Sequence, residues 1–308
     1  MPELPEVETI RRQLEPRLLG ATITDSWTIG TPKFSDAPLA LGCSINGVRR
    51  LGKYLLMGLT SATGEGFSGA PEEQTGGAFR PTERELIVHL GMTGRLAVVE
   101  KPTGVRPGEL LPSDVSPGSG GVPTGFSHVR ASWSLTGDRT LIFDDVRRFG
   151  RIAVVEVGDY RSLPTLFALG PEPFADSFTP ESLREAVNGS SRAVKTQLLS
   201  QRVVAGVGNI YADEALWLAG VHPRAQRLTR AQAVLLRDEI RNVLRAGIED
   251  GGTTLRNYRD ADGGSGSHQE RLLCYGRAGQ DCRRCGTILR RIVVDARSTT
   301  YCPVCQRR

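Results

Sequence analysis

Four of the six cysteines lie close to the C-terminus in two pairs, arranged as Cys282-x2-Cys285-x16-Cys302-x2-Cys305. Two such pairs at this separation are typical of a tetrahedral Zn²⁺ site with four thiolate ligands, which leaves no coordination position open for water. Stretches with β character at 288–294 and 298–301 predict a hairpin between the pairs. We therefore expect one structural zinc ion. Disulfides are the disfavoured alternative, because the N-terminus has no apolar secretory segment. The two cysteines outside this pattern are expected to be ordinary apolar residues: Cys43 and Cys274.

Basic charge is concentrated in the same C-terminal segment. Residues 282–308 contain seven arginines and one acid, Asp295, a net charge of +6, whereas the whole chain of 308 residues carries +5. A basic hairpin held by a metal favours a polyanionic partner, and Arg297 within it fits phosphate recognition. Only four of the 39 basic residues are lysines. GC-rich codons explain the same scarcity, but we take Lys53 and Lys195 as candidate positions for a role that needs a compact ammonium.

The first half of the chain is predicted to be a β-sandwich preceded by a helix. Apolar residues recur every three or four positions between residues 3 and 19, which predicts a helix close to the N-terminus. Short runs rich in valine, isoleucine and leucine follow without helices between them, so antiparallel pairing is favoured over βαβ units. The runs are 54–59, 85–90, 95–100, 129–135, 140–144 and 151–157.

The second half is predicted to be helical, which makes the fold class α+β. We expect a sandwich domain at 1–157, a linker at 158–175, a helical domain at 176–271 and a zinc finger at 272–308. Two stretches rich in glycine, proline and serine are expected to be surface insertions: 61–81 and 102–125. The predicted helices of the second half are 183–187, 193–199, 210–219 and 231–248.

Two short stretches carry further chemical information. Gly206 and Gly208 predict a tight turn before a helix that Asn209 opens, where backbone N–H groups attract phosphate; an ordinary helix cap explains the same residues. At the N-terminus, removal of Met1 would give Pro2 a free secondary amine. An α-amine has a pKa of about 7.7–8.0, so at neutral pH it can attack an electrophilic sugar carbon while Glu3 moves protons. Taken alone, this stretch favours a proline that merely starts a helix.

Several motifs, in this order along the chain, resemble those of the bacterial formamidopyrimidine-DNA glycosylases, which repair 8-oxoguanine. The resemblance covers nearly the whole chain apart from the two insertions, and it implies the sandwich, a helix–two-turn–helix domain and the zinc-finger hairpin. Leu4 stands where the sister family, endonuclease VIII, typically has glycine. The motifs are MPELPEVET at 1–9, GKYLL at 52–56, HLGMTG at 89–94, RRFG at 147–150, GVGNIYADE at 206–214 and the four-cysteine finger.

The resemblance implies a bifunctional glycosylase and abasic-site lyase of base excision repair. Pro2 is expected to attack C1′ of the damaged nucleotide and form a Schiff base, and Glu3 is expected to act as general acid and base. Lys53 is expected to contact phosphate and assist base removal, and Glu6 to lie at the base pocket. Elimination in β and δ steps then cuts both flanking phosphodiesters, without a redox cofactor or catalytic metal.

The resemblance also assigns residues that hold DNA around an extruded base. Met92, Arg147 and Phe149 are expected to fill the gap left in the duplex. Lys195, Asn209 and Arg297 are expected to contact phosphates. The loop at 253–271 is expected to close over the base, with Thr254 and Tyr258 as contacts. Val146 departs from the family, whose members often have proline there.

The expected partner is damaged double-stranded DNA, bound by a monomer in the cytoplasm at the nucleoid. No apolar run approaches the ~20 residues needed to span a bilayer, so no membrane association is expected. Two alternatives remain. One is specificity for oxidised pyrimidines, as in endonuclease VIII. The other is a non-catalytic damage-binding protein, which would require loss of the proline or of the lysine; both Pro2 and Lys53 are present.

Overall fold

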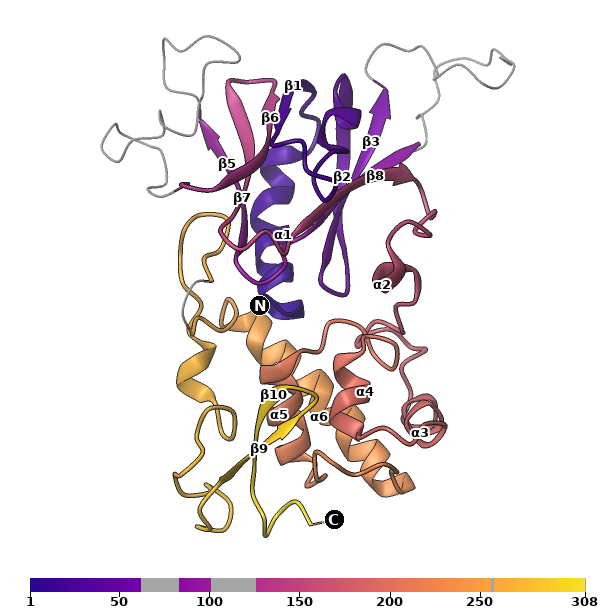
Figure 1. Cartoon of the computed structure of the whole chain (residues 1–308), viewed down its shortest axis with the longest axis vertical. Coiled ribbons are helices and arrows are strands. Elements are labelled where there is room, and N and C mark those ends of the chain that lie inside the picture. The colour runs from indigo at the N-terminus through magenta and orange to yellow at the C-terminus, as the bar shows by residue number, and fades with distance from the viewer. Residues whose placement is uncertain (62–82, 101–125, 256–257, 308) are drawn as a thin grey trace.

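The computed structural model describes residues 1–61, 83–100, 126–255 and 258–307. The predicted insertions at 61–81 and 102–125 lie outside the described residues, except for Ser61. Figure 1 shows two lobes stacked along the long axis, a β-rich lobe and a helical lobe that carries a small hairpin. This arrangement confirms the expected α+β class.

Helix α1 (Leu4–Leu18) connects the two lobes. Its start is fixed locally, because the Glu3 backbone N–H donates to Glu6 Oε2 at 2.7 Å and Pro5 stands in the first turn. Leu4 packs in the core of the helical lobe. The later apolar residues of the helix pack in the core of the β lobe: Val7, Ile10, Leu14 and Leu18.

Two four-stranded antiparallel sheets form the β lobe, as the sequence predicts. Side chains from both sheets and from α1 share one core. The second face of the sheet that contains β3 is covered by the segment around Leu163 and Leu166, so β3 is buried on both sides. One sheet has the order β2 (Cys43–Leu51), β3 (Tyr54–Ser61), β4 (Arg84–His89), β8 (Arg151–Glu156); the other has β1 (Ile23–Thr28), β6 (Val129–Leu135), β7 (Arg139–Asp145), β5 (Gly94–Glu100).

The helical lobe packs α5 (Asn209–Leu218) against α6 (Arg230–Glu249) around a second core. Thr229 begins α6 with a capping box, in which its hydroxyl accepts the Gln232 N–H at 3.2 Å and the Gln232 side chain accepts the Thr229 N–H. The remaining elements are α2 (Pro164–Phe167), α3 (Pro180–Asn188), α4 (Val194–Leu199) and the 3₁₀ turns η1 (Ala37–Ala40) and η2 (His268–Arg271). Among the described residues, no helix combines the length and the apolar character that crossing a bilayer requires.

The predicted hairpin is present as β9 (Arg290–Val294) and β10 (Arg297–Tyr301). Its two-residue turn, Asp295 and Ala296, has positive φ at both positions, which is the geometry of a type I′ hairpin turn. Because that turn is so short, it fixes Arg297 at the tip of the hairpin.

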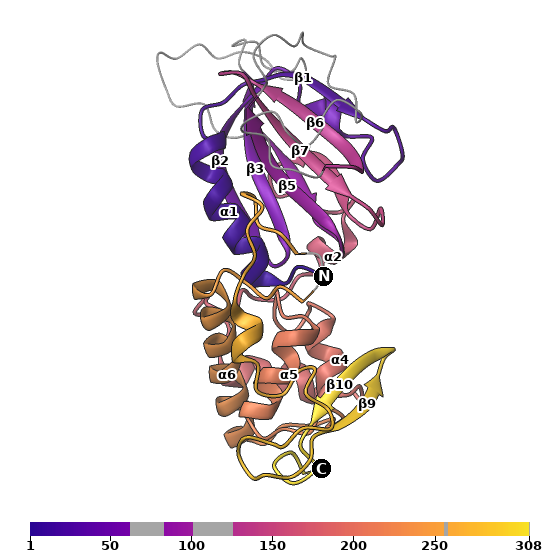
Figure 2. The same cartoon turned by 90° about the vertical axis from the view of Figure 1, so that its left-hand side faces the viewer.

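The segment after α6 returns to the β lobe, as both views show (Figures 1 and 2). Ala261 is fully buried in the sandwich core, and its N–H donates to Gln13 Oε1 at 2.9 Å. At the opposite end of the chain, the Leu4 N–H donates to the Gly206 carbonyl at 3.0 Å. The lobes are thus joined at the N-terminus and by this returning segment, and the candidate site lies between them.

Candidate functional site

A cleft of about 210 Å³ lies at the junction of the lobes and gathers residues from every part of the chain. Five residues that the sequence singled out line it: Glu3, Lys53, Met92, Asn209 and Arg297. They come from the start of α1, the turn before β3, the turn after β4, the start of α5 and the hairpin tip. The other lining residues, which the motifs did not indicate as contacts, are Met1, Leu199, Gly208, Ile210, Leu255 and Tyr275.

Glu3 is buried at the floor of this cleft, with one carboxylate oxygen held. Glu3 Oε1 accepts the Ile210 backbone N–H at 2.9 Å, at the N-terminus of α5, where the helix dipole favours negative charge. Glu3 Oε2 is buried and has no hydrogen-bond partner among the described residues. Gly208 is required here because a Cβ at that position would overlap the Glu3 carboxylate. A carboxylate with one oxygen held by a hydrogen bond and the other without a partner suits a side chain that moves protons.

Glu6 lies one turn further along α1 and joins three segments. Glu6 Oε1 accepts the Tyr211 hydroxyl at 2.9 Å and the Thr253 N–H at 2.7 Å. Burial, reinforced by the nearby Glu3 charge, raises the pKa of Glu6 to about 7. Glu6 therefore ties α1 to α5 and to the loop after α6, and it does not line the cleft itself.

Lys53 is buried in the turn before β3 and has no hydrogen bond or ion pair with another described residue. Burial lowers the pKa of Lys53, opposed by the charges of Glu3 and Glu6. Burial, together with the positive charge of Lys53, also lowers the pKa of His89 to about 4. The α-amine of Met1 likewise has a lowered pKa because it is buried. Burial thus lowers the pKa of three basic groups, those of Lys53, His89 and the Met1 α-amine.

The predicted duplex-filling residues lie on two adjacent loops. Phe149 is 47% exposed, and the Arg147 guanidinium lies over its ring at 4.7 Å from the centroid. The 147–150 loop and the turn carrying Met92 are joined by Asp145, a fully buried residue that the sequence analysis did not single out. Asp145 Oδ1 accepts the Thr93 hydroxyl at 2.6 Å, and its Oδ2 accepts the Gly150 N–H at 2.7 Å. The Val146 side chain, which stands where the family often has proline, is exposed.

The three predicted phosphate contacts differ in their surroundings. Asn209 and Arg297 line the cleft. The Lys195 side chain is 0% exposed and forms an ion pair with Asp213 inside the helical lobe. The phosphate contact expected of Lys195 stays a prediction, and a phosphate could reach the ammonium only if the pair opened.

In the predicted covering loop, Thr254 and Tyr258 make contacts inside the protein, and their expected contacts with the base stay a prediction. Tyr258 packs against the sandwich core, and its hydroxyl lies 3.4 Å from the Glu6 carbonyl. The Thr254 N–H donates to Gln269 Oε1 at 2.8 Å within the loop. Leu255, an exposed apolar residue, is the loop residue that lines the cleft. Residues 256 and 257 lie outside the described residues.

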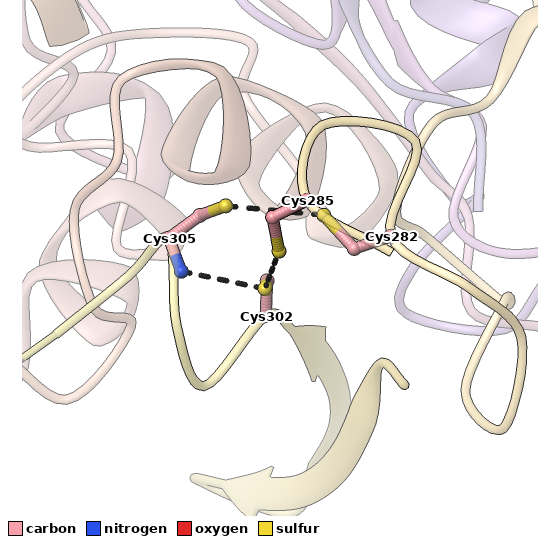
Figure 3. Close-up of side chains that lie close together, drawn as sticks. All are labelled: Cys282, Cys285, Cys302 and Cys305. Carbon is pink, nitrogen blue, oxygen red and sulfur yellow. Dashed lines mark hydrogen bonds between the residues drawn. The ribbon is translucent and has the colours of Figure 1, made fainter. Parts of the chain in front are cut away.

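The four paired cysteines form a metal site at the base of the hairpin. Figure 3 shows their sulfur atoms facing one another, and all four Sγ atoms lie within 4.8 Å of each other. Cys282 Sγ lies 3.9 Å from Cys305 Sγ, and Cys285 Sγ lies 3.5 Å from Cys302 Sγ. Tetrahedral zinc with Zn–S bonds of about 2.3 Å separates sulfurs by about 3.8 Å. The six cysteines are free, so these residues fit one structural zinc ion.

Comparison with known proteins agrees with this architecture. Residues 1–152 match the formamidopyrimidine-DNA glycosylase N-terminal domain, 169–259 the formamidopyrimidine-DNA glycosylase H2TH domain, and 279–308 the zinc finger found in FPG and IleRS. The chain is 42% identical to formamidopyrimidine-DNA glycosylase of Deinococcus radiodurans, over 99% of this chain and 97% of that protein.

Two solved structures give the same result in three dimensions. The crystal structure of the MutM (FPG) protein of Thermus thermophilus has a TM-score of 0.79 at 39% identity and covers 99% of this chain and 98% of that one. The complex between Lactococcus lactis Fpg and DNA containing an abasic site has a TM-score of 0.77 at 31% identity and covers 99% and 100%. The chain described here belongs to the formamidopyrimidine-DNA glycosylase family.

Proposed function

We propose that this chain is a bifunctional DNA glycosylase and abasic-site lyase that removes oxidised purines, 8-oxoguanine and formamidopyrimidines, from duplex DNA. The observation that carries the proposal is that Glu3, Lys53, Asn209 and Arg297 line one cleft together with Met1, the neighbour of Pro2. The cleft thus places a proton carrier, an ammonium and two phosphate-binding candidates beside one amine. Damaged duplex DNA is the proposed partner, and the solved complex of the Lactococcus lactis relative contains DNA with an abasic site.

Pro2 is the proposed nucleophile. Its secondary amine attacks C1′, and the C1′–N bond breaks as the damaged base leaves with the bonding electrons. The Glu3 carboxylate takes the proton from the Pro2 nitrogen and gives it to the ring oxygen as the C1′–O bond breaks and the sugar opens, which leaves an iminium between Pro2 and C1′. The iminium acidifies the C2′ protons, so the 3′ phosphate and then the 5′ phosphate are eliminated. Burial lowers the pKa of the α-amine at this end of the chain, which supports an unprotonated nucleophile.

The remaining residues have positioning roles in the proposal. Lys53 contacts a phosphate and assists base removal. Met92, Arg147 and Phe149 occupy the gap in the duplex, where Phe149 presents its exposed ring as the apolar wedge. Arg147 donates to the unpaired cytosine, which favours cytosine over adenine opposite the lesion. Asn209 and Arg297 hold the phosphates that flank the lesion.

Met1 must be absent for this reaction. It lines the cleft, and while it is attached the Pro2 nitrogen belongs to an amide. Active chains are therefore those from which Met1 has been removed. This requirement supplies an internal control, because the amount of covalent adduct must scale with the fraction of processed chains.

Borohydride trapping tests the proposal. The protein is incubated with a duplex containing 8-oxoguanine opposite cytosine, reduced, and the adduct is mapped by mass spectrometry. Intact-mass measurement gives the fraction of chains lacking Met1, and an undamaged duplex is the substrate control. We expect an adduct at Pro2 in proportion to that fraction, together with strand cleavage that leaves phosphates on both sides of the gap.

Other outcomes point to the alternatives. Binding without trapping or cleavage by processed chains would refute the enzyme and leave a damage-binding protein. Cleavage of thymine-glycol DNA far in excess of 8-oxoguanine DNA would indicate the specificity of endonuclease VIII. An adduct at Lys53 would overturn the assignment of the nucleophile while keeping the lyase.

A further inference from the structure

The buried ion pair between Lys195 and Asp213 lies beneath the hairpin. Lys195 is on α4 and Asp213 on α5, and their side chains are 0% and 1% exposed. The Lys195 ammonium also donates to Thr299 Oγ1 at 2.8 Å and approaches the Ser298 carbonyl at 3.4 Å. All of its strong contacts are therefore made inside the protein, and two of them are to strand β10.

Asp213 holds the same strand with its second oxygen. Asp213 Oδ2 accepts the Thr300 N–H at 2.9 Å. The amide nitrogen of Asn209, one turn earlier on α5, donates to the Ser298 carbonyl at 3.1 Å. The pair and Asn209 together hold three consecutive residues of β10, beginning one residue after Arg297.

Glu214, the neighbour of Asp213, holds the segment that leads into the finger. Its carboxylate accepts three consecutive backbone N–H groups, from Leu273, Cys274 and Tyr275, at 2.8, 2.8 and 2.7 Å. Tyr275 lines the same cleft as Arg297. Two adjacent acids of α5 therefore hold the entry to the finger and its last strand.

Opening the Lys195 pair would be costly. A buried charge that loses its partner is strongly destabilised, and Asp213 would face the interior without compensation. A phosphate that recruited Lys195 would also release β10 from α4. The contacts favour a lysine that stays in place when DNA binds.

We infer that Lys195 is a positioning residue and not a phosphate ligand: with Asp213 it fixes strand β10 on α4 and α5, so that Arg297 and Asn209 face one DNA backbone. The inference rests on the proposed function only for the identity of the phosphate contacts. The clamp itself, defined as Lys195, Asp213 and Thr299, is a property of the folded chain.

Asp213→Asn separates the two roles by the sign of its effect. If Lys195 bound phosphate, removing its internal partner would free the ammonium, and affinity for an undamaged duplex would stay the same or rise. If Lys195 positions β10, the variant should lose affinity, by no more than the loss produced by Arg297→Gln. Fluorescence anisotropy with an undamaged duplex at several salt concentrations measures the affinity of Asp213→Asn and of Arg297→Gln. The zinc content of each preparation is verified.

A double-mutant cycle then tests whether the clamp acts through Arg297. In an Arg297→Gln background, Asp213→Asn should add less than a twofold further loss of affinity. Its salt dependence should match that of Arg297→Gln alone. Full additivity of the two losses would overturn the inference, because it would show that Asp213 affects binding independently of Arg297.

Thr299 supplies a milder pair of variants in case Asp213→Asn fails to fold. Thr299→Val removes the hydroxyl that Lys195 contacts, whereas Thr299→Ser retains it. We expect Thr299→Val to weaken duplex binding. We expect the duplex affinity of Thr299→Ser to stay within twofold of that of the unaltered chain. Equal behaviour of the two variants would refute the role of the hydroxyl in the clamp.

Hydrogen exchange tests the clamp without DNA or catalysis. The Thr300 amide, which donates to Asp213, should exchange at least tenfold faster in Thr299→Val than in Thr299→Ser, with amides of the β lobe unchanged. Unchanged exchange at Thr300 would overturn the inference. A failure of trapping at Pro2 would refute the proposed enzyme and leave this result intact, so the two failures are distinguishable.

Discussion

The Glu3 carboxylate accepts the backbone N–H of Ile210 at 2.9 Å, across 207 positions of sequence. The contact joins the residue that precedes α1 to the first turn of α5, so a helix of the opposite lobe fixes the carboxylate beside the N-terminal residues. The reacting end of the chain is thereby held by both lobes.

Glu3→Gln should abolish proton transfer while keeping this contact, since an amide oxygen can still accept the Ile210 N–H. We expect base release from 8-oxoguanine DNA to fall by about 10²–10⁴-fold in single-turnover kinetics. Thermal stability should change little. Glu15→Gln, on the partly exposed side of α1 where Glu15 pairs with Arg11, is the matched control and should retain activity. A Glu3→Gln chain as active as this control would contradict the proton-carrier role.

Glu6 should make stability depend on pH. Its folded pKa of about 7 exceeds the ordinary 4.5, so between these values the folded chain binds more protons than the unfolded chain. Its contribution is complete below pH 4.5 and is lost as pH rises through about 7, a change of about 3 kcal/mol at ~1.4 kcal/mol per pKa unit.

Urea unfolding at pH 5 and pH 8 measures this effect in the unaltered chain and in Glu6→Gln. The free energy of unfolding should fall more steeply with pH in the unaltered chain. The difference in slope is the test, because the amide also loses one hydrogen-bond acceptor at every pH. Parallel pH profiles for the two chains would show that Glu6 titrates normally.

Asp145 should determine how well the 147–150 loop fills the duplex. Asp145→Asn keeps the shape of the side chain but turns one acceptor oxygen into a donor that faces Gly150 or Thr93. Leaving a buried group unsatisfied costs about 1–3 kcal/mol. We expect the free energy of unfolding to fall by about that amount, base release opposite cytosine to slow, and the preference for cytosine over adenine to decrease.

Asp144→Asn is the control for this variant. Asp144 is also largely buried, but its carboxylate accepts the His128 N–H and does not contact the 147–150 loop. We expect Asp144→Asn to lose a comparable amount of stability and to keep the preference for cytosine over adenine. If both variants change the preference equally, the loop does not depend on Asp145 in particular.

Much of the fold was predictable because its signals are local. Cysteine spacing predicted the finger, and runs of β-branched residues predicted six strands that the structure contains. Strands β1 and β2 escaped prediction because polar residues interrupt them, as Asp25 and Ser26 do in β1. Strand β1 is defined by its pairing with β6, more than a hundred residues away, and β2 by its pairing with the neighbouring β3.

The site was less predictable because burial depends on distant partners. Lys53 and Lys195 stand out equally among the rare lysines, yet Lys53 lines the cleft and Lys195 is enclosed. The difference lies in Asp213 and Thr299, which meet Lys195 only in the folded chain. Asp145 was overlooked for the same reason, since its contact with Thr93 spans two separate loops. The domain boundaries drawn from the sequence remain a prediction.

Arg297→Gln should weaken binding to damaged and undamaged duplexes to the same degree, since a phosphate contact carries no information about the base. The slope of log affinity against log salt concentration should fall by about one. Titration of both duplexes between low and physiological salt measures this. A loss confined to damaged DNA would place Arg297 at the lesion and contradict the phosphate assignment.

Removal of zinc should weaken duplex binding and leave the β lobe folded, because the metal holds only the two cysteine pairs at the base of the hairpin. Trp217 packs beside Cys282 and Cys302, whereas Trp133 is buried in the sandwich core, so tryptophan fluorescence can separate the two regions. Chelation should change the tryptophan emission of the unaltered chain and should leave the emission of a Trp217→Phe chain unchanged. The duplex affinity of the chelated protein should fall at least as far as that of Arg297→Gln. Restored zinc should reverse both effects. Undiminished binding by verified zinc-free protein would mean that the hairpin keeps Arg297 in place without the metal, through the clamp alone.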